Sequence, residues 1–301
     1  MQSNVLVNLK QRGLLEAITD PAVNDFVNKP CTAYAGFDPS SSSLQAGNLI
    51  AAFGLAHFQR CGHRVIAVVG GATGLIGDPS GKSNERPVLS VEQVEENIAG
   101  ITENLSRLLD FKHPTAPAII LNNNDWMRKF TFVDFLREVG RHFRLGTMLN
   151  KESVRARLES ESGMSFTEFS YQLLQSYDFL HLYDTKDCRI QLGGSDQWGN
   201  ITAGIDLIRK VRSGDAYGVT SPIVCDAAGH KFGKSEGNAI YLDPRRTSYY
   251  NFYQFFVRTT DADVVRFLKM FTFLPLEDIS ALEKTFLEAP EKREAQKALA
   301  G

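Results

Sequence analysis

Two lysines stand three residues apart in the polar segment Lys-Phe-Gly-Lys-Ser at 231–235. On a glycine-containing loop, Lys231 and Lys234 can close on a polyphosphate and release it again, because each ammonium group offers three donors on a flexible stem. Such a pair is common in solvated turns, so it indicates a phosphate site only if a second segment elsewhere in the chain supports it. Residues 37–48 supply one, since a strand-like run ends there and a helix begins, and a helix start attracts anions. The two segments together predict phosphate chemistry, with nucleotide activation as its first form.

The elements that must position these segments alternate along the first half of the chain. Apolar runs predict strands at 31–37, 64–70 and 118–121, helical periodicity predicts helices at 47–60 and 91–109, and a glycine-rich loop occupies 70–82. The uninterrupted apolar run at 64–70 is typical of a strand buried on both faces. Strands that alternate with helices indicate a parallel sheet wound with helices, so the expected fold class is α/β.

The alternation resumes after an irregular helical stretch at about 126–162, which we interpret as an insertion. Helices are expected at 166–180 and 198–211, strands at 189–192 and 219–224, and only helices beyond 247. We therefore expect three parts, which are a sheet domain at 1–225 with the insertion, a mobile phosphate-binding loop and connection at 226–246, and a helical domain at 247–301. The chain ends within a helical pattern that has no stop signal, which is typical of a truncation.

Composition narrows the class of protein. The 301-residue chain has 43% hydrophobic and 23% charged residues, as globular proteins do. Its formal net charge of -2 excludes a basic field over the whole protein, so contact with nucleic acid would depend on local patches. Four scattered cysteines without zinc-ligand spacing predict reduced core thiols and no metal site. An amphipathic N-terminal helix, and no apolar run of the roughly 20 residues that span a bilayer, predict a soluble intracellular protein without a membrane partner.

Polar residues and glycines gather at or near the carboxyl ends of four of the predicted strands. They are Tyr34, Gly36, Asp38 and Ser40, then Asp78, Lys82 and Arg86, then Asn123, and finally Gly193, Asp196 and Gln197. Ligands of open parallel sheets bind beyond the carboxyl ends of the strands, near the point where the strand order reverses. Loop tips are polar in any protein, so it is the concentration at one edge that predicts a site.

The glycines at 70–77 and 77–83 match no nucleotide-binding motif. The second run has three residues between its first glycine and Gly-Lys-Ser, one fewer than a P-loop needs, and the first lacks the order of a dinucleotide-binding turn. Tight turns and close approach of a ligand to the backbone are both open explanations of these glycines.

Five ordered motifs resemble those of bacterial or organellar tyrosyl-tRNA synthetases. They are Asp38-Pro39 with Leu-Gln-Ala-Gly-Asn at 44–48, Gly-Gly-Ala-Thr-Gly-Leu-Ile-Gly-Asp-Pro-Ser at 70–80, Ser-Phe-Thr-Glu-Phe-Ser-Tyr at 165–171, Gln-Leu-Gly-Gly-Ser-Asp-Gln-Trp-Gly-Asn at 191–200, and the segment at 231–235. The similarity runs from the N-terminal helix to Gly301. It implies a class I synthetase with a Rossmann-like catalytic domain, which joins L-tyrosine to ATP as tyrosyl-adenylate and then passes the tyrosyl group to tRNA(Tyr).

The resemblance implies a tyrosine pocket. Tyr34 and Asp178 would hold the substrate phenol, and a phenol and a carboxylate are the groups that a buried hydroxyl needs. Tyr171, Gln175 and Asp78 would bind the α-ammonium group. The spacing of Tyr171, Gln175 and Asp178 puts all three on one helix face. A solvated helix face is the alternative explanation of that spacing.

The same resemblance implies the nucleotide contacts. Asp196 and the backbone of Gly193 and Gly194 would bind the ribose, and Gln197 would lie at the carboxylate end of the amino acid. The other ATP-binding positions would be Gly36, Asp38, Ser40, Gly47 and Ser235. Lys82, Arg86, Lys231 and Lys234 would hold the departing pyrophosphate. Mg²⁺ would arrive with ATP, bound through the phosphates instead of a protein cage.

The chain departs from the family at its signature, where Gln45-Ala-Gly-Asn48 replaces His-x-Gly-His. An imidazole in such a site donates an N–H to phosphate, and the amide nitrogens of Gln45 and Asn48 reach about as far as the outer and inner imidazole nitrogens. We therefore expect the catalytic donors, and activity, to be retained. Gly47 keeps room for adenine, and Ser40 keeps a hydroxyl for the γ-phosphate.

Two rival interpretations remain. Loss of both histidines would suit a non-catalytic RNA-binding or scaffold protein, and the missing C-terminal tRNA-binding domain would suit adenylation of tyrosine for another acceptor. The intact pocket and lysines favour the ligase, although weak charging of tRNA is expected. The family is homodimeric, and apolar residues of the insertion are either an interface or core, namely Phe130, Phe132, Phe135, Leu136 and Phe143. The expected compartment is the cytoplasm, with a mitochondrial or plastid matrix as the alternative.

Overall fold

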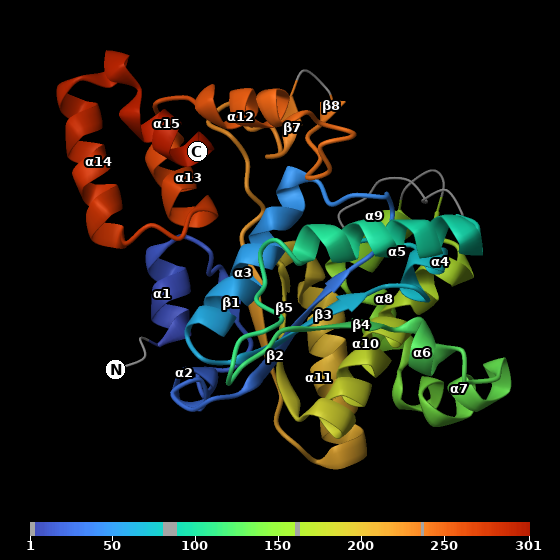
Figure 1. The fold of residues 1–301 in the computed structure, drawn as a ribbon. Coiled ribbons are helices and arrows are strands. Elements are labelled where there is room, and N and C mark those ends of the chain that lie inside the picture. The colour runs from blue at the N-terminus through green and yellow to red at the C-terminus, as the bar shows by residue number, and fades with distance from the viewer. Residues whose placement is uncertain (1–3, 81–88, 160–162, 236–237) are drawn as a thin grey trace.

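A computed structural model of the chain describes residues 4–80, 89–159, 163–235 and 238–301. Within these ranges the centre is a six-stranded sheet with the order β1-β6-β5-β2-β3-β4, in which β1 alone runs antiparallel to its neighbour (Figure 1). The strands are β1 (Ala17–Ile18), β2 (Thr32–Phe37), β3 (Arg64–Val69), β4 (Ile119–Asn122), β5 (Cys188–Gly194) and β6 (Tyr217–Ser221). The expected α/β fold with a mostly parallel sheet is confirmed.

Helices cover both faces of the sheet (Figure 1). They are α1 (Val5–Gln11), α2 (Val23–Phe26), α3 (Leu49–Arg60), α4 (Thr73–Ile76), α5 (Val91–Leu105), α6 (Asn124–Met127), α7 (Phe132–Glu138), α8 (Leu145–Leu149), α9 (Glu152–Leu158), α10 (Phe166–Lys186), α11 (Trp198–Arg212), α12 (Tyr249–Val257), α13 (Val264–Phe271), α14 (Leu276–Glu288) and α15 (Glu294–Ala300). Helices α3 and α5 lie on one face, and α10 and α11 lie on the other. Helices α12 to α15 form a group of their own beside α1 and α3.

The strand order reverses between β2 and β5. From β2 the chain moves to β3 and β4 on one side, and it later returns to β5 and β6 on the other. Tyr34 of β2 is paired in register with Ile66 of β3 and with Gln191 of β5. The carboxyl ends of β2 and β5 therefore enclose the crevice in which sheets of this type bind ligands.

Alternate side chains of the central strands enter two different cores. Val65, Ala67 and Val69 of β3 belong to the core that contains α1 and α3, whereas Ile66 and Val68 belong to the core beneath α10. Successive side chains of a strand point to opposite faces, so burial of both faces requires an apolar residue at every position. The prediction from the uninterrupted apolar run at 64–70 is confirmed.

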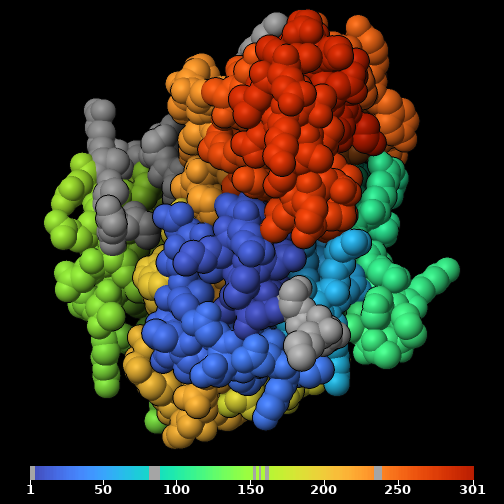
Figure 2. Space-filling view, turned by 90° about the vertical axis from the view of Figure 1, so that its left-hand side faces the viewer, coloured from blue at the N-terminus to red at the C-terminus, as the bar shows by residue number. Residues whose placement is uncertain are grey.

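The helical group rests on the N-terminal segment, as Figure 2 shows for the red and blue parts of the surface. Arg12 follows α1 and is buried. Its guanidinium donates hydrogen bonds to the carbonyl oxygens of Lys269 (3.2 Å), Thr272 (3.0 Å) and Leu274 (2.8 Å), at the end of α13. Lys269 lies in the last turn of α13, where carbonyls have no partner within the helix, and Thr272 and Leu274 follow that helix. Arg12 therefore both caps α13 and fixes it to the sheet domain.

Some boundaries differ from expectation. The loop expected at 70–82 contains the short helix α4. Strand β6 ends at Ser221, because the next residue, Pro222, has no N–H to extend the ladder. Gly193 and Gly194 belong to β5 instead of following it. The short strand β1 was not anticipated.

The remaining expectations hold in part. The insertion is helical and contains α6 to α9, and α10 continues beyond its predicted end to Lys186. The four cysteines are free, but only Cys61 and Cys188 are buried, whereas Cys31 and Cys225 are half-buried. No helix among the described residues is long and apolar enough to cross a membrane.

Candidate active site

A cavity of about 380 Å³ opens at the carboxyl ends of β2 and β5. Strand β2 contributes Tyr34 and Gly36, strand β5 contributes Gln191, Gly193 and Gly194, and α10 supplies part of the wall. A Cβ atom at Gly36 would meet no described atom within 4 Å. The absence of a side chain at Gly36 therefore leaves the space between the two strands open to a ligand.

Asp178 of α10 is a buried carboxylate in the cavity wall. It accepts hydrogen bonds from Trp126 Nε1 at 2.7 Å and from Asn123 Nδ2 at 3.0 Å. Burial raises the pKa of Asp178 to about 7, and the two hydrogen bonds act against this rise because they favour the charged form. An ionised carboxylate has about four acceptor sites, so Asp178 retains acceptor capacity for a ligand hydroxyl.

The Tyr34 hydroxyl is buried in the same wall and has no hydrogen-bond partner among the described residues. Its ring packs against Phe179, with 5.3 Å between the ring centroids. Burial, reinforced by the charge of Asp178, raises the pKa of Tyr34 well above its usual value, so the hydroxyl stays protonated. Leaving a buried donor unpaired costs about 1–3 kcal/mol. A ligand hydroxyl between Tyr34 and Asp178 would remove that cost.

Further carboxylates crowd the cavity wall. The Tyr171 hydroxyl donates to Asp38 Oδ2 at 2.8 Å, and Gln197 Nε2 donates to Asp78 Oδ2 at 2.6 Å. Burial and the charges of Asp38 and Asp78 raise the pKa of Tyr171, and burial followed by the charge of Asp78 raises the pKa of Asp196. Such a concentration of negative charge favours a cationic ligand group, such as an ammonium.

An amide network joins α10 to α11 in this wall. The Asn200 amide nitrogen lies 3.1 Å from Gln175 Oε1, 3.2 Å from Gln197 Oε1 and 3.3 Å from Ser80 Oγ. The backbone N–H of Ser80 in turn donates to Asp78 Oδ1 at 2.9 Å. These contacts fix the positions of the polar groups around Asp78.

The two segments predicted to hold phosphate meet at the start of α3, which is preceded by the 3₁₀ turn η1 (Ala46–Asn48). The N–H of Ala46 donates to the carbonyl of Ile240 at 2.8 Å, and the N–H of Leu242 donates to the carbonyl of Leu44 at 2.9 Å. We call residues 226–242 the lysine segment. Its described part is thus joined by backbone hydrogen bonds to the turn that opens α3, and the same cavity is lined by Gly47, Asn48 and Lys231.

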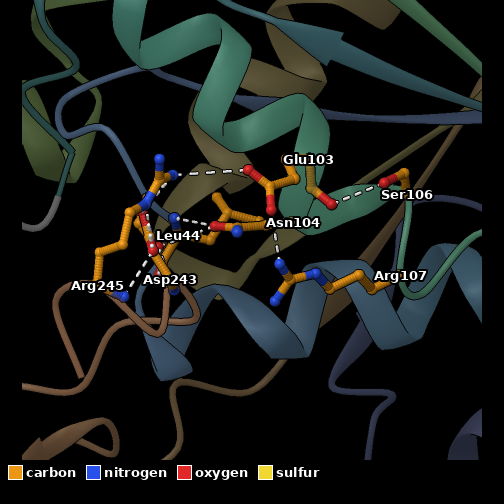
Figure 3. A network of polar contacts seen from close by, with 8 residues as sticks. Leu44, Glu103, Asn104, Ser106, Arg107, Asp243 and Arg245 are labelled. Atoms are coloured by element: carbon orange, nitrogen blue, oxygen red, sulfur yellow. Dashed lines mark hydrogen bonds and ion pairs between the residues drawn. The ribbon is translucent and has the colours of Figure 1, made fainter. Parts of the chain in front are cut away.

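A polar network fixes the chain just after the lysine segment (Figure 3). Asn104 of α5 accepts hydrogen bonds from the Leu44 N–H and the Ser43 hydroxyl, both at 2.9 Å, and Ser43 Oγ accepts one from the Asp243 N–H at 3.0 Å. Arg245 forms an ion pair with Asp243 at 2.7 Å. The turn before α3, helix α5 and the end of the lysine segment are therefore held as one unit.

The two amides that replace the signature histidines are placed differently. The backbone N–H of Gln45 donates to Asn48 Oδ1 at 2.9 Å, so the amide oxygen of Asn48 is engaged and its nitrogen is left as a donor. Asn48 lines the cavity, whereas the half-buried Gln45 is not among the lining residues. Of the two predicted donors, the structure brings only Asn48 to the cavity.

Most of the predicted site residues line this one cavity. They are Tyr34, Gly36, Asp38, Ser40, Gly47, Asn48, Asp78, Tyr171, Gln175, Asp178, Gly193, Gly194, Asp196, Gln197 and Lys231. Lys82 and Arg86 lie outside the described residues, as do the side chains of Lys234 and Ser235, whose backbone forms the short strand β7 (Lys234–Ser235). Tyr171 and Asp178 are only 5% and 4% exposed, so a solvated helix face does not explain their spacing. The described residues contain no cluster of three or more His, Cys, Asp or Glu side chains suited to a metal.

The structure brings to the site several groups to which the sequence analysis gave no role, although it did place Asn123 at a strand end. They are Thr73, Asn123, Trp126, Gln191 and Asn200. Asn123 and Trp126 follow the carboxyl end of β4, so the strand-end rule gave a signal for them. Gln191 lies inside a strand and gave none, although its Oε1 atom is buried without a partner among the described residues.

Two of the glycines at 70–77 serve different purposes in the structure. A Cβ atom at Gly70 would collide with the Asp38 carboxylate and the Thr73 hydroxyl, and the Thr73 hydroxyl donates to Asp38 Oδ1 at 2.7 Å. Because Gly70 has no side chain, the Asp38 carboxylate and the Thr73 hydroxyl have room to approach its backbone. Gly77, with φ of 85°, does serve a turn, because it ends α4 in a conformation that favours glycine.

This arrangement of sheet, cavity and lysine segment has known counterparts. A family model described as tRNA synthetases class I (W and Y) matches residues 27–301. The chain therefore belongs to the class I tRNA synthetases for tryptophan and tyrosine.

Individual relatives narrow that class. A tyrosine–tRNA ligase of Protochlamydia amoebophila (strain UWE25) is 54% identical over 99% of this chain and 70% of its own length, and one of Bacillus caldotenax is 54% identical over 99% of this chain and 71% of its own. A C-terminally truncated mitochondrial tyrosyl-tRNA synthetase of Coccidioides posadasii is 32% identical with a TM-score of 0.86, covering 99% of this chain and 86% of that one. Within its class the chain is a member of the tyrosyl-tRNA synthetase family, as the motifs predicted, and the relatives support the ligase and not the scaffold.

Proposed function

We propose that the chain performs the ligase reaction of its family, in which L-tyrosine and ATP form tyrosyl-adenylate and pyrophosphate, and the tyrosyl group then passes to tRNA(Tyr). ATP is a substrate throughout this family. One observation carries the proposal. The Tyr34 hydroxyl, which has no partner in the part of the chain that the structure describes, and the Asp178 carboxylate share a cavity with Lys231, so the proposed sites for a phenol and for phosphate are continuous.

The amino acid would be recognised by hydrogen bonds at both ends. Its phenol would accept from Tyr34 and donate to Asp178, whereas phenylalanine would leave both groups unpaired in a buried site. Its ammonium group would lie among Asp78, Tyr171 and Gln175, where carboxylates provide a negative environment. Gln197 is held by Asp78 and would lie at the carboxylate end.

In the first chemical step, a carboxylate oxygen of tyrosine attacks the α-phosphorus of ATP, and the bond from that phosphorus to the pyrophosphate oxygen breaks. Negative charge grows on the leaving pyrophosphate, and donors that bind it more strongly in the transition state raise the rate. Lys231 and the Asn48 amide are the described donors on this side. Lys82, Arg86 and Lys234 complete the proposed set, and Mg²⁺ bound to the phosphates would share the charge.

The ribose would bind at the end of β5. Asp196 is the proposed acceptor for its hydroxyls, and a Cβ atom at Gly194 would collide with the Asp196 carboxylate, so the strand must be bare there. Burial raises the pKa of Asp196, and the positive charge of Lys231 acts in the opposite direction. The proposed roles of Gly36, Ser40, Gly47 and Ser235 in ATP binding are those predicted from the sequence.

The other expectations stay proposals of the same kind. They are the three-part division at 225 and 246, tRNA(Tyr) as the acceptor, a homodimer and a cytoplasmic location. The dimer is supported by exposed apolar side chains on α7, since Phe132, Val133 and Leu136 are 67%, 69% and 40% exposed. Phe135 and Phe143 of the insertion pack against the core instead. Some apolar residues of the insertion are therefore exposed, as an interface requires, and others belong to the core.

Exchange of labelled pyrophosphate into ATP, dependent on tyrosine, tests the proposal directly. The wild-type chain should catalyse exchange with tyrosine and far less with phenylalanine. Lys231→Ala should reduce the exchange rate by roughly 10²- to 10³-fold, because it removes a donor to the transition state. Tyr34→Phe should retain exchange but reduce the preference for tyrosine by up to about 10-fold, the value of one hydrogen bond.

Arg209→Ala is the matched control for these variants. Arg209 forms an exposed ion pair with Asp206 on α11, and neither residue lines the cavity, so its removal should leave both exchange and amino-acid preference unchanged. A wild-type chain that catalyses no tyrosine-dependent exchange would overturn the proposed function.

A further inference from the structure

Phe232 stands between the two lysines of the lysine segment, and its ring packs into the helical group. The ring stacks on Phe271 of α13, with 4.4 Å between centroids and an interplanar angle of 11°. Phe267 meets it edge-on at 4.9 Å, and Phe255 lies at 5.4 Å. Aromatic pairs of this geometry contribute beyond their burial, so the ring is held on several sides by residues of α12 and α13.

The backbone on either side of the ring is held as well. The Phe232 N–H donates to the carbonyl of Val224, and the carbonyl of Gly233 accepts from the Ile240 N–H, both at 2.9 Å. Gly233 has a φ of 92°, and a Cβ atom there would lie 2.7 Å from the backbone nitrogen of Gly47. The segment thus passes between the turn before α3 and the Phe271 ring of α13, and the close packing leaves no space for a Cβ atom at position 233.

Lys231 occupies the position just before this fixed point. Its side chain is exposed, so packing of the lysine itself does not determine where its ammonium group stands. It lines the cavity together with Phe232. The direction in which the Lys231 side chain leaves the backbone therefore depends on how the backbone of residues 231–233 is held, by the pairing of Lys231 with Cys225 and by the bonds of Phe232 and Gly233.

We propose that Phe232 is a positioning residue for the adenylation step, and that its stack on Phe271 holds the Lys231 ammonium over the pyrophosphate. The inference rests on the proposed function of the cavity. It adds that a residue of the helical group, which does not line the cavity, controls a phosphate-binding lysine. A leucine at 232 keeps much of the apolar volume but loses the stack, so the lysine would be displaced without loss of the fold.

The test compares Phe232→Leu and Phe271→Leu with the wild type. Both variants should lower kcat for pyrophosphate exchange by about 10-fold or more, since small misplacements of a catalytic group are costly. Both should leave the dissociation constant of tyrosine unchanged, which a general loss of structure would not do. In a double-mutant cycle, Phe232→Leu should add little to Lys231→Ala, because it acts through the lysine.

Phe252→Leu is the matched control. Phe252 lies on α12 and packs against Phe256, but it forms no ring contact with Phe232 among the described residues. The control should retain wild-type kcat. Full additivity of Phe232→Leu with Lys231→Ala, or an equal loss of kcat in Phe252→Leu, would overturn the proposal.

Binding of inorganic pyrophosphate alone separates this proposal from the proposed function. Phe232→Leu and Lys231→Ala should each weaken pyrophosphate binding, measured by calorimetry, and the double variant should be no weaker than Lys231→Ala. If the wild type fails to exchange pyrophosphate with tyrosine, the proposed function fails, and this binding cycle decides the positioning role by itself. Unchanged pyrophosphate binding in Phe232→Leu would then refute it.

Discussion

At the scale of single residues, the cavity keeps two polar groups in states that cost stability. Tyr34 holds a buried hydroxyl without a described partner, and Asp178 holds a carboxyl group whose pKa is raised by burial. Trp126 and Asn123 offset only part of the cost of the buried charge. A protein under selection for stability alone would replace such groups by apolar ones. Their presence is best explained by a ligand that pairs with both.

Asp178 predicts a distinctive pH dependence of stability. Its pKa rises from 3.8 to about 7 in the folded chain, so the folded chain binds the proton more tightly than the unfolded one. The contribution of Asp178 is therefore complete below pH 3.8 and is lost as the pH rises towards 7. The free energy of unfolding of the wild type, relative to Asp178→Asn, should fall by up to about 1.4 kcal/mol per pH unit over that range and then level off.

Urea denaturation at a series of pH values measures this difference. Trp126→Phe removes one donor to the carboxylate and should raise the pKa of Asp178 further. The decline in the free energy of unfolding should therefore continue to higher pH. A difference between wild type and Asp178→Asn that stays flat from pH 4 to 8 would show that the carboxyl group is not perturbed.

At the scale of elements, two helices perform unlike tasks. Helix α10 presents Tyr171, Gln175 and Asp178 to the cavity from one buried face, so the spacing of three residues builds much of the pocket. Helix α13 takes no part in the pocket, but its last turn is capped by Arg12 and its Phe271 ring meets the lysine segment. The catalytic geometry therefore depends on a helix that is remote from the substrate.

Substitution of Arg12 tests how much its hydrogen bonds contribute to holding α13 against the sheet domain. Arg12→Met retains the apolar stem but leaves three backbone carbonyls without their donor, which should lower the free energy of unfolding by about 3 kcal/mol. Proteolysis within residues 238–301 should also become faster. The exposed ion pair of Arg107 is the comparison, and Arg107→Ala should cost less than about 1 kcal/mol. Equal stability of the two variants would rule out Arg12 as the anchor.

At the scale of the whole molecule, strand order unites segments that lie far apart in the chain. The reversal between β2 and β5 places Tyr34 beside Gln191, and the turn before α3 meets the lysine segment across the same opening. The insertion exposes large apolar side chains, including Phe132 of α7, and Phe166 at the start of α10 is equally exposed at 67%. Apolar surface of this kind is expected to be covered by a second copy.

The homodimer can be tested by sedimentation. The wild-type chain should sediment at twice its 33.5 kDa mass at micromolar concentration. Phe132→Glu and Phe166→Glu should each shift the equilibrium towards monomer, because a charge cannot be buried there without a partner. Val7→Glu, at an exposed apolar position on α1, is the matched control and should remain dimeric. A monomeric wild type would contradict the proposal.

Much of the fold and of the amino-acid pocket was predictable from the sequence because both depend on short-range patterns. Apolar runs marked β2 and β3, and the spacing on α10 predicted a single face. Strand β1 was not predicted because a strand of two residues is too short to show a hydrophobic period in the sequence. The end of β6 was misplaced because the apolar run continues past Pro222, although a proline cannot extend the ladder.

Other features could not be predicted because they depend on which distant groups meet. Gln45 and Asn48 were predicted to have equivalent roles, yet a hydrogen bond between them engages the Asn48 oxygen, and of the two only Asn48 lines the cavity. Gly47 was expected to leave room for adenine, but a Cβ atom there would also press on the Phe232 carbonyl at 3.3 Å. Trp126 was read as the start of an insertion, although its indole N–H holds Asp178.

The stack of Phe232 on Phe271 has a consequence for biosynthesis. The cavity residues from Tyr34 to Gln197 leave the ribosome before Phe271, on whose ring Phe232 stacks, has been made. Synthesis therefore completes the residues proposed to bind the amino acid before it completes the aromatic contact proposed to position Lys231. If that contact acts as proposed, adenylation requires that α13 has been made and packed.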